Sequence, residues 1–158
     1  MRKNINVLIV VFLFLNISCK TKDLTIYSDP DIINVLIAQK GDVFEFTVKN
    51  KSSEIIYFMS SKSLDIEKLV NGKWVQLRIL PCPCDAPCRN SEQEIILKNK
   101  GSYSFFWNMK ESWCGDKKIS RMVRETITQK IDKGKYRINL KVKQSNGIIQ
   151  IIKEEFVY

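Results

Sequence analysis

The sequence of 158 residues contains no histidine and has only six glycines and four prolines. The lack of histidine excludes the Ser-His-Asp and Cys-His nucleophile systems and the common histidine ligands of metals. The glycines do not form a phosphate-binding loop, and no internal repeat or low-complexity segment is present. Carboxylates occur in exposed-looking settings such as "SLDIEKL" and "KEEF", without a pairing that indicates acid–base chemistry. We therefore predict that the protein is not an enzyme and uses no cofactor.

Long apolar runs are scarce too, and the one at the N-terminus has the order of a secretory signal. Two cations precede an apolar stretch over residues 7–15, and Ser18 stands directly before Cys19. The stretch is too short to cross a hydrocarbon core of about 30 Å, so residues 1–18 are predicted to be a signal peptide. The Ser-Cys junction resembles the lipobox of Bacteroidetes-type lipoproteins, which implies diacylglycerol on the Cys19 sulfur and an acyl chain such as palmitate on the new N-terminus. An ordinary cleaved signal or an uncleaved anchor is the alternative.

The lipobox resemblance implies a protein of the cell envelope. Each buried methylene contributes about 0.8 kcal/mol, so several acyl chains hold a protein on a membrane essentially permanently. We expect residues 19–31 to be a tether and the anchor to lie in the outer membrane, with the folded part facing the periplasm or exposed at the surface. Without the signal, 24 basic and 17 acidic residues give a net charge of +7. The lysines are scattered rather than clustered beside aromatic residues, so we expect no nucleic-acid partner.

Residues 32–158 carry the pattern of short β-strands. In "DVFEFTVKN", the phenylalanines and the last valine alternate with polar residues, which predicts a half-buried strand with the apolar side inward. Asn71-Gly72 and Asn146-Gly147 are strong hairpin signals between apolar runs. Seven or eight short strands separated by turns predict one all-β domain, an antiparallel β-sandwich.

One segment has an ambiguous pattern. In "VRETITQKI", apolar residues recur every four positions as in a helix, whereas Thr126, Ile127 and Thr128 favour a strand. We favour a strand over a helix for residues 119–131.

The turn "DKGKY" has the Asp-x-Gly-x-Tyr spacing of the tyrosine corner of immunoglobulin-like domains. In that corner, a tyrosine near the start of a strand directs its hydroxyl to upstream backbone. We expect Asp132 to cap the turn, Gly134 to permit its tight backbone, and Tyr136 to donate the hydrogen bond. A lysine-rich turn before a strand that begins with an aromatic residue is the alternative.

The order of these elements resembles the bacterial intracellular proteinase inhibitor family, whose domain is immunoglobulin-like. The matching stretches are "FEFTVKNKSSEIIYF", "NGKWV", "LKNKGSYSFFW" and "KGKYRINLKV", which span most of residues 42–143. The resemblance implies the sandwich fold. The signal segment and the further cysteines depart from an intracellular inhibitor, and no reactive loop corresponds, so the activity is not carried over.

Four cysteines remain once Cys19 is assigned to the lipid. Cys82, Cys84 and Cys88 lie in "PCPCDAPC", and Cys114 lies in "ESWCGD". An even number of cysteines in an oxidising compartment favours two disulfides. A bond between Cys82 and Cys84 would close a very small ring, so we expect Cys114 to pair with Cys82 or Cys84, and Cys88 with the other.

The same four cysteines have two other interpretations. Four thiolates could bind zinc or copper(I), but the spacing C-x-C-x3-C lacks the two C-x2-C pairs of a zinc knuckle. A redox pair would require C-x-x-C, which does not occur. We therefore predict no metal, and a covalent staple that joins the loop after the Trp74 strand to the loop after the Trp107 strand.

These features favour a membrane-anchored, non-enzymatic binding or scaffold protein of the cell envelope. Its partner would be another envelope protein, which the sequence does not identify. An exported peptidase inhibitor, implied by the family resemblance, and a thiolate metal-binding protein are the alternatives.

Overall fold

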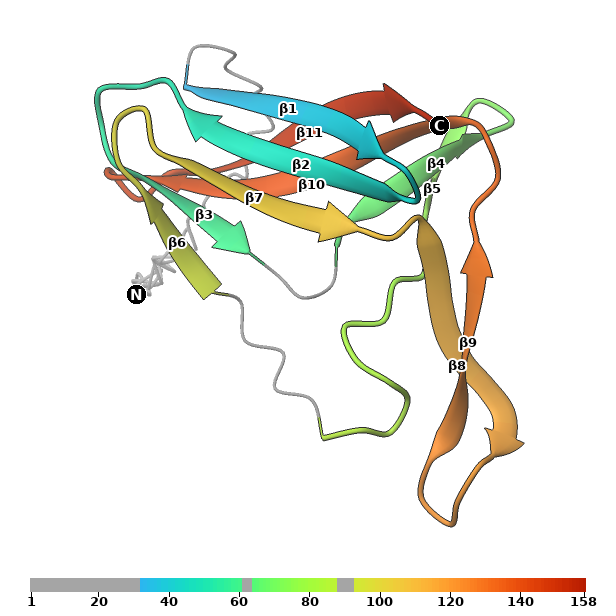
Figure 1. Ribbon diagram of the computed structural model, residues 1–158. Coiled ribbons are helices and arrows are strands. Elements are labelled where there is room, and N and C mark those ends of the chain that lie inside the picture. Colours follow the sequence, from blue (N-terminus) through green and yellow to red (C-terminus); the bar gives the residue numbers. More distant parts are fainter. Residues whose placement is uncertain (1–31, 61–63, 88–92) are drawn as a thin grey trace, which may run out of the picture.

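The computed structural model describes residues 32–60, 64–87 and 93–158, where the chain is all-β and antiparallel (Figure 1). No helix in these three ranges is long and apolar enough to cross a membrane. The predicted signal segment, the tether and Cys19 lie outside the described residues. The strands are β1 (Ile33–Lys40), β2 (Val43–Asn50), β3 (Ile56–Ser60), β4 (Ile66–Val70), β5 (Lys73–Gln76), β6 (Gln93–Leu97), β7 (Ser102–Trp107), β8 (Lys110–Lys118), β9 (Arg124–Lys130), β10 (Lys135–Gln144) and β11 (Ile149–Val157).

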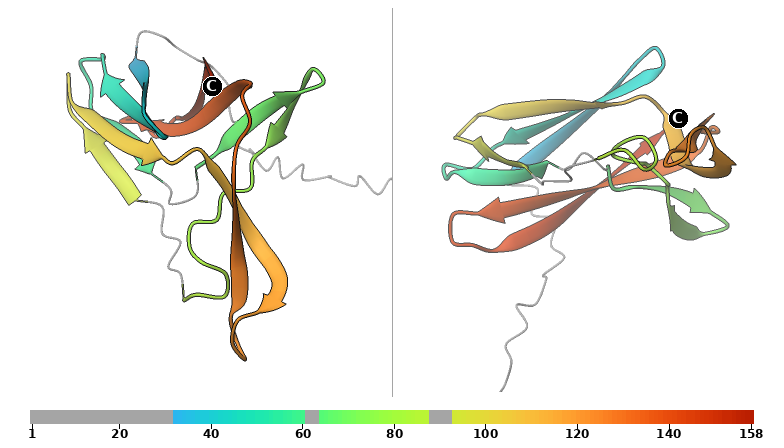
Figure 2. Two further views of the ribbon diagram at one scale, coloured as in Figure 1. Left: turned by 45° about the vertical axis from the view of Figure 1, so that its right-hand side comes forward. Right: turned by 90° about the horizontal axis from the view of Figure 1, so that it is seen from below.

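The strands form a sandwich of two sheets and a separate hairpin (Figures 1 and 2). The smaller sheet has the order β1-β2-β7. In the larger sheet, β11 pairs along one side of β10, while β4 and β3 pair with the beginning and the end of its other side. β5 and β6 extend the sheet beyond β4 and β3. The prediction of an antiparallel β-sandwich is confirmed.

The described residues contain eleven strands, more than the seven or eight predicted. The sequence pattern did not indicate β8, because this strand is polar and contributes one buried residue, Gly115. β5 is shorter than its apolar run suggested and ends at Gln76. The Leu77 amide still donates to the Ile66 carbonyl at 2.8 Å, after which the chain leaves the sheet.

The core lies between the two sheets and is rich in aromatic rings. Phe44, Phe46 and Val48 of β2 are buried, as their alternation predicted. Alternate residues of β10 are buried against them from the other sheet. The rings of Phe44 and Phe156 meet edge to face, with centroids 4.9 Å apart. Burying one phenylalanine side chain contributes about 1.5–3 kcal/mol, so this cluster holds the sheets together.

Both predicted hairpin turns are present. Asn71 and Gly72 have positive φ angles of 49° and 77°, as the mirror-image turns of two-residue hairpins require. Gly147 has a φ of 84° in the turn between β10 and β11. The turn at residues 98–101 does not close a hairpin within one sheet. It carries the chain from β6 in the larger sheet to β7 in the smaller one.

β8 and β9 form a hairpin, here called the arm (residues 110–130), which projects from the sandwich (Figures 1 and 2). Within the ambiguous segment, residues 124–130 are a strand, as favoured, while residues 119–123 belong to the turn between β8 and β9. The β-branched residues Thr126, Ile127 and Thr128 of this strand pair with β8. Gly115 leaves room for the opposite strand, since a Cβ there would lie 2.8 Å from Cγ of Glu125.

Candidate functional site

The segment of residues 77–87, here called the cysteine loop, leaves the larger sheet and lies along the arm. The Ser112 amide donates to the Arg78 carbonyl at 2.7 Å, and the Leu80 amide donates to Oγ of Ser112 at 2.8 Å. The guanidinium of Arg78 lies over the Trp113 ring, 4.0 Å from its centroid. Prolines 81, 83 and 87 limit ladder pairing, because proline has no amide hydrogen. The loop is therefore held to the arm by specific contacts rather than by a third strand.

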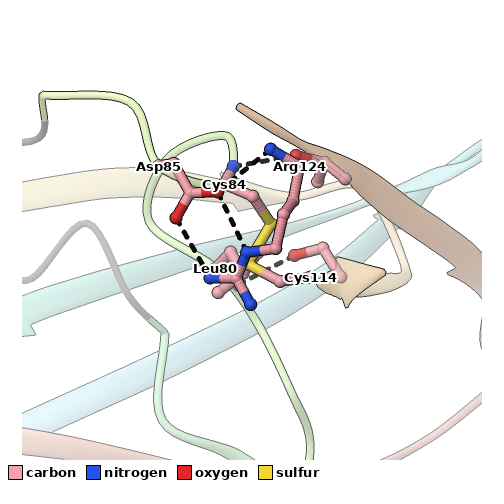
Figure 3. The surroundings of a disulfide bond; sticks show 7 residues. Leu80, Cys84, Asp85, Cys114 and Arg124 are labelled. Carbon is pink, nitrogen blue, oxygen red and sulfur yellow. Dashed lines mark hydrogen bonds and ion pairs between the residues drawn. A yellow bond between two sulfur atoms is a disulfide. The ribbon is translucent and has the colours of Figure 1, made fainter. Parts of the chain in front are cut away.

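A disulfide between Cys84 and Cys114 joins the cysteine loop to the arm (Figure 3). The two Cα atoms are 5.5 Å apart, Cys84 is buried, and its amide donates to Oγ1 of Thr126 at 2.9 Å. This is one of the two pairings that the sequence left open for Cys114. Cys82 is disulfide-bonded as well, while Cys88 lies outside the described residues.

The staple differs from the prediction in what it joins. Cys114 is not in a loop after the Trp107 strand but in the middle of β8. The disulfide therefore fixes a loop to a strand, and so to a regular hairpin. The sulfurs of Cys84 and Cys114 are bonded to each other and offer no thiolate to a metal. Among the described residues, no three Cys, Asp or Glu side chains are grouped so that they could hold a metal ion.

An ion pair beside the disulfide adds a second link (Figure 3). Oδ2 of Asp85 accepts from both Nε and the backbone amide of Arg124 at 3.0 Å, and Oδ1 accepts from Nη2 at 3.0 Å. These hydrogen bonds, with the positive charge of Arg124, lower the pKa of Asp85 to about 2. Asp85 also has a positive φ of 56°, a conformation that aspartate adopts more readily than most residues.

An open groove of about 570 Å³, here called the arm groove, lies between the arm, the cysteine loop and the end of β7. Its apolar lining includes Ile79, Leu80, Phe105 and Phe106, with the Phe106 side chain 60% exposed. Among the described residues that line the groove, Lys110 has the one charged side chain. Hydroxyl groups of the arm supply the polar wall. This lining suits an apolar chain segment that also needs a few hydrogen bonds.

The edge of β7 gives the arm groove a further property. Within the described residues, β7 pairs with β2 on one side and with no strand on the other. An unpaired edge presents a row of backbone N–H and C=O groups that can bond to an added strand. The arm groove therefore combines apolar contacts with a backbone template.

The predicted corner residues lie at the base of the arm. The fully buried Tyr136 donates a hydrogen bond from its hydroxyl to the Asp132 carbonyl. The Asp132 carboxylate does not supply the expected cap; it lies 3.4 Å from Nζ of Lys68. Gly134 lacks a positive φ. A Cβ at this position would lie 3.3 Å from Cε of Lys68, at the flexible end of that side chain, so a small shift of Lys68 would make room for it.

Sequence reasoning did not find Asp85 and Arg124, which are 39 positions apart. Nothing in either local sequence indicates that they pair. The aspartate in the middle of the cysteine motif was the one available signal that the loop has a polar partner. The groove itself depends on the path of β8, which the sequence pattern did not reveal.

Comparisons with known proteins give little further guidance. No protein-family model matches the chain, and no curated protein matches it. One similar solved structure is described as the X-ray structure of Northeast Structural Genomics Consortium target SoR45. It is 10% identical in sequence, with a TM-score of 0.43, over 80% of this chain and 85% of that one.

Proposed function

We propose that the protein is a non-enzymatic binding lipoprotein of the cell envelope, held in the outer membrane by lipid on Cys19. Its partner is another envelope protein, and an extended segment of that partner binds in the arm groove. The observation that carries this proposal is the stapled arm, which holds an apolar groove open beside the free edge of β7. A rigid site of this kind binds a partner without a large ordering cost.

The sequence of the N-terminus supports the anchor. Ser18 and Cys19 follow a short apolar stretch in the order of a lipoprotein signal. A disulfide is also what an exported protein is expected to contain. The folded part would face the periplasm or the cell surface, and the described strands begin at residue 33, after a 13-residue tether at positions 19–31.

We further infer that the sandwich is immunoglobulin-like. The orders β1-β2-β7 and β11-β10-β3 match the A-B-E and G-F-C arrangements of such domains. The hydrogen bond from Tyr136 lies at the start of β10, the counterpart of strand F. In this assignment the arm is an insertion between strands E and F. The partner site is therefore an addition to a common scaffold.

Site-specific photo-cross-linking in living cells tests the binding site. A p-benzoylphenylalanine replaces Phe106 in the arm groove, and a matched control replaces Leu36, which is 53% exposed on β1. We expect discrete cross-linked protein adducts from position 106 and not from position 36. Phe106→Asp, combined with a probe at Leu80, should abolish the adduct. Equal labelling at positions 36 and 106, or turnover of a small substrate by the purified protein, would contradict the proposal.

An exported peptidase inhibitor is a second candidate, favoured by the rigidity of the cysteine loop. Inhibitory loops bind proteases in a preformed conformation, and here a disulfide and the Asp85–Arg124 ion pair fix the loop. Inhibition assays against a panel of secreted and periplasmic proteases distinguish the candidates. Inhibition that Cys84→Ser weakens supports this second function, and failure against the whole panel removes it.

A further inference from the structure

The tip of the arm, residues 117–122, has the sequence KKISRM and contains three cations and no acidic residue. It lies at the end of the hairpin farthest from the sandwich (Figures 1 and 2). Two large apolar side chains project from it, Ile119 with 65% and Met122 with 85% of its surface exposed. Exposed apolar residues between cations at the end of a projecting hairpin cannot stabilise the fold, because they contact no core.

The backbone of the tip is held in a defined turn. The amides of Ile119 and Ser120 donate to the Val123 carbonyl at 2.9 and 3.2 Å. Below the turn, the Cys84–Cys114 disulfide and the Asp85–Arg124 ion pair brace the two strands. The apolar pair is therefore presented by a braced support, so little conformational entropy is lost when it docks.

The cations of the tip are not held in place by hydrogen-bond or ion-pair partners. Within the described residues, the side chains of Lys117, Lys118 and Arg121 form no hydrogen bond or ion pair, although the charge of Lys118 also acts on the Asp85 carboxylate. The nearby Arg124 differs, because Asp85 neutralises it. Three cationic side chains that are not held in ion pairs thus flank Ile119 and Met122.

Two apolar side chains and three cations are too small a surface for a stable protein complex, which buries about 800 Å² on each partner. They match an anionic lipid surface better. There, apolar side chains enter the boundary between headgroups and acyl chains while cations remain at the headgroups. Each lysine or arginine near an anionic membrane strengthens association about five-fold.

We propose that the arm tip is a membrane-docking site that binds an anionic phospholipid surface, with Ile119 and Met122 inserted and Lys117, Lys118 and Arg121 at the headgroups. This role goes beyond partner binding. It would fix the orientation of the sandwich and of the arm groove relative to the bilayer. Docking of the tip does not require lipid on Cys19, so an experiment can contradict the tip proposal and leave the lipid-anchor proposal intact, or the reverse.

Depth-dependent fluorescence quenching tests the proposal. The full chain with Met122→Trp is reconstituted into vesicles of phosphatidylglycerol and phosphatidylcholine that contain brominated acyl chains. The signal of the chain without the substitution is subtracted. The matched control is Ile96→Trp, on β6 of the sandwich, where the side chain is 59% exposed. We expect strong quenching and a blue shift for the tip probe in anionic vesicles, and neither for the control.

The cations are tested on the same probe. Lys117→Gln, Lys118→Gln and Arg121→Gln together should lower the docking equilibrium about 100-fold, since three five-fold contributions are lost. Circular dichroism checks that each variant keeps its β fold. Added salt should weaken the quenching of the parent chain. No quenching of the tip probe, or equal quenching in pure phosphatidylcholine vesicles, would overturn the proposal.

Discussion

At the scale of single residues, Asn50 is the one fully buried polar side chain in the described part of the chain. Its Nδ2 donates to the carbonyls of Glu54 and Leu97 at 2.7 and 2.9 Å. Its Oδ1 accepts from the amide and the hydroxyl of Ser52 at 2.9 and 2.8 Å. Asn50 therefore ties the end of β2 to the turn before β3 and to the end of β6, in both sheets.

We expect Asn50→Ala to lower the free energy of unfolding by about 2–4 kcal/mol, because it leaves the buried Leu97 carbonyl and the partly buried Glu54 carbonyl without this donor. Chemical denaturation measures the change. Asn50→Asp is the matched variant, since it keeps the volume and the acceptor for Ser52 but removes the donors, and it should be at least as destabilising. An Asn50→Ala protein as stable as the parent would show that these hydrogen bonds make no net contribution.

Tyr136 gives the second prediction at this scale. Tyr136→Phe should cost about 1–2 kcal/mol, because the hydroxyl loses its bond to the Asp132 carbonyl. Burial raises the pKa of the Tyr136 phenol above its usual value, against the opposing charge of Lys68. The folded state thus retains the proton longer than the unfolded state. This contribution to stability is present below about pH 10 and is lost as the pH rises through the folded pKa.

Denaturation curves measured across the alkaline range test this assignment. The stability of the parent protein should fall more steeply above pH 10 than that of Tyr136→Phe, which has no phenol to titrate. Tyr57→Phe, on the half-buried β3 position, is the control. Parallel pH profiles for the parent and Tyr136→Phe would mean that the corner tyrosine ionises as freely in the folded as in the unfolded chain.

At the scale of elements, the arm depends on the disulfide. Cys84 and Cys114 are separated by 30 positions. Closing a loop of this length contributes about 3.5 kcal/mol in the chain-entropy model. Cys84→Ser combined with Cys114→Ser should therefore lower stability by about that amount. Hydrogen exchange, followed by mass spectrometry, should show the largest increase in the amide exchange rate in residues 77–87 and 110–130. The increase should be small in β2 and β10. An equal increase in exchange rate in all strands would contradict the claim that the disulfide stabilises the arm locally.

The Asp85–Arg124 pair should make the arm sensitive to acid. The pKa of Asp85 is lowered to about 2, so its stabilising contribution is complete above about pH 4. It is lost as the pH falls through 2, where the carboxylate gains a proton. The NMR shift of the Arg124 Nε–H should follow this titration. Asp85→Asn should remove the transition, and a midpoint near the ordinary value of 3.8 would show that the pair is not formed in solution.

The elements differ in how far the sequence could predict them. The alternation in β2 and the Asn-Gly turns are local signals, and the structure confirms both. β8 was not predicted, because its apolar residues do not alternate with polar ones as in a half-buried strand. It is stabilised by β9, the disulfide and the cysteine loop rather than by the core. The arm groove was not predicted either, because it depends on tertiary contacts rather than on a local pattern. Its walls come from segments that are brought together by Cys84 and Cys114 and by the path of the cysteine loop.

At the scale of the whole molecule, the protein is a sandwich with an added arm. The sandwich holds the aromatic core, while the arm carries the groove at its base and the cationic tip at its end. In the proposed arrangement, lipid on Cys19 and the tip of the arm both contact the membrane. The tether of residues 19–31 spans at most about 45 Å when fully extended, so the sandwich stays close to the bilayer. The groove would then face partners in or near the same membrane.

The proposed lipid anchor is tested most directly by the mass of the mature N-terminal peptide of protein purified from bacterial envelopes in detergent. We expect a chain that begins at Cys19, with a diacylglycerol thioether on the sulfur and an acyl chain on the amine. Cys19→Ser should keep residues 1–18 and carry no lipid. A mature chain that begins at another residue, or an unmodified Cys19 in the parent protein, would contradict the central claim that this is a membrane-anchored lipoprotein.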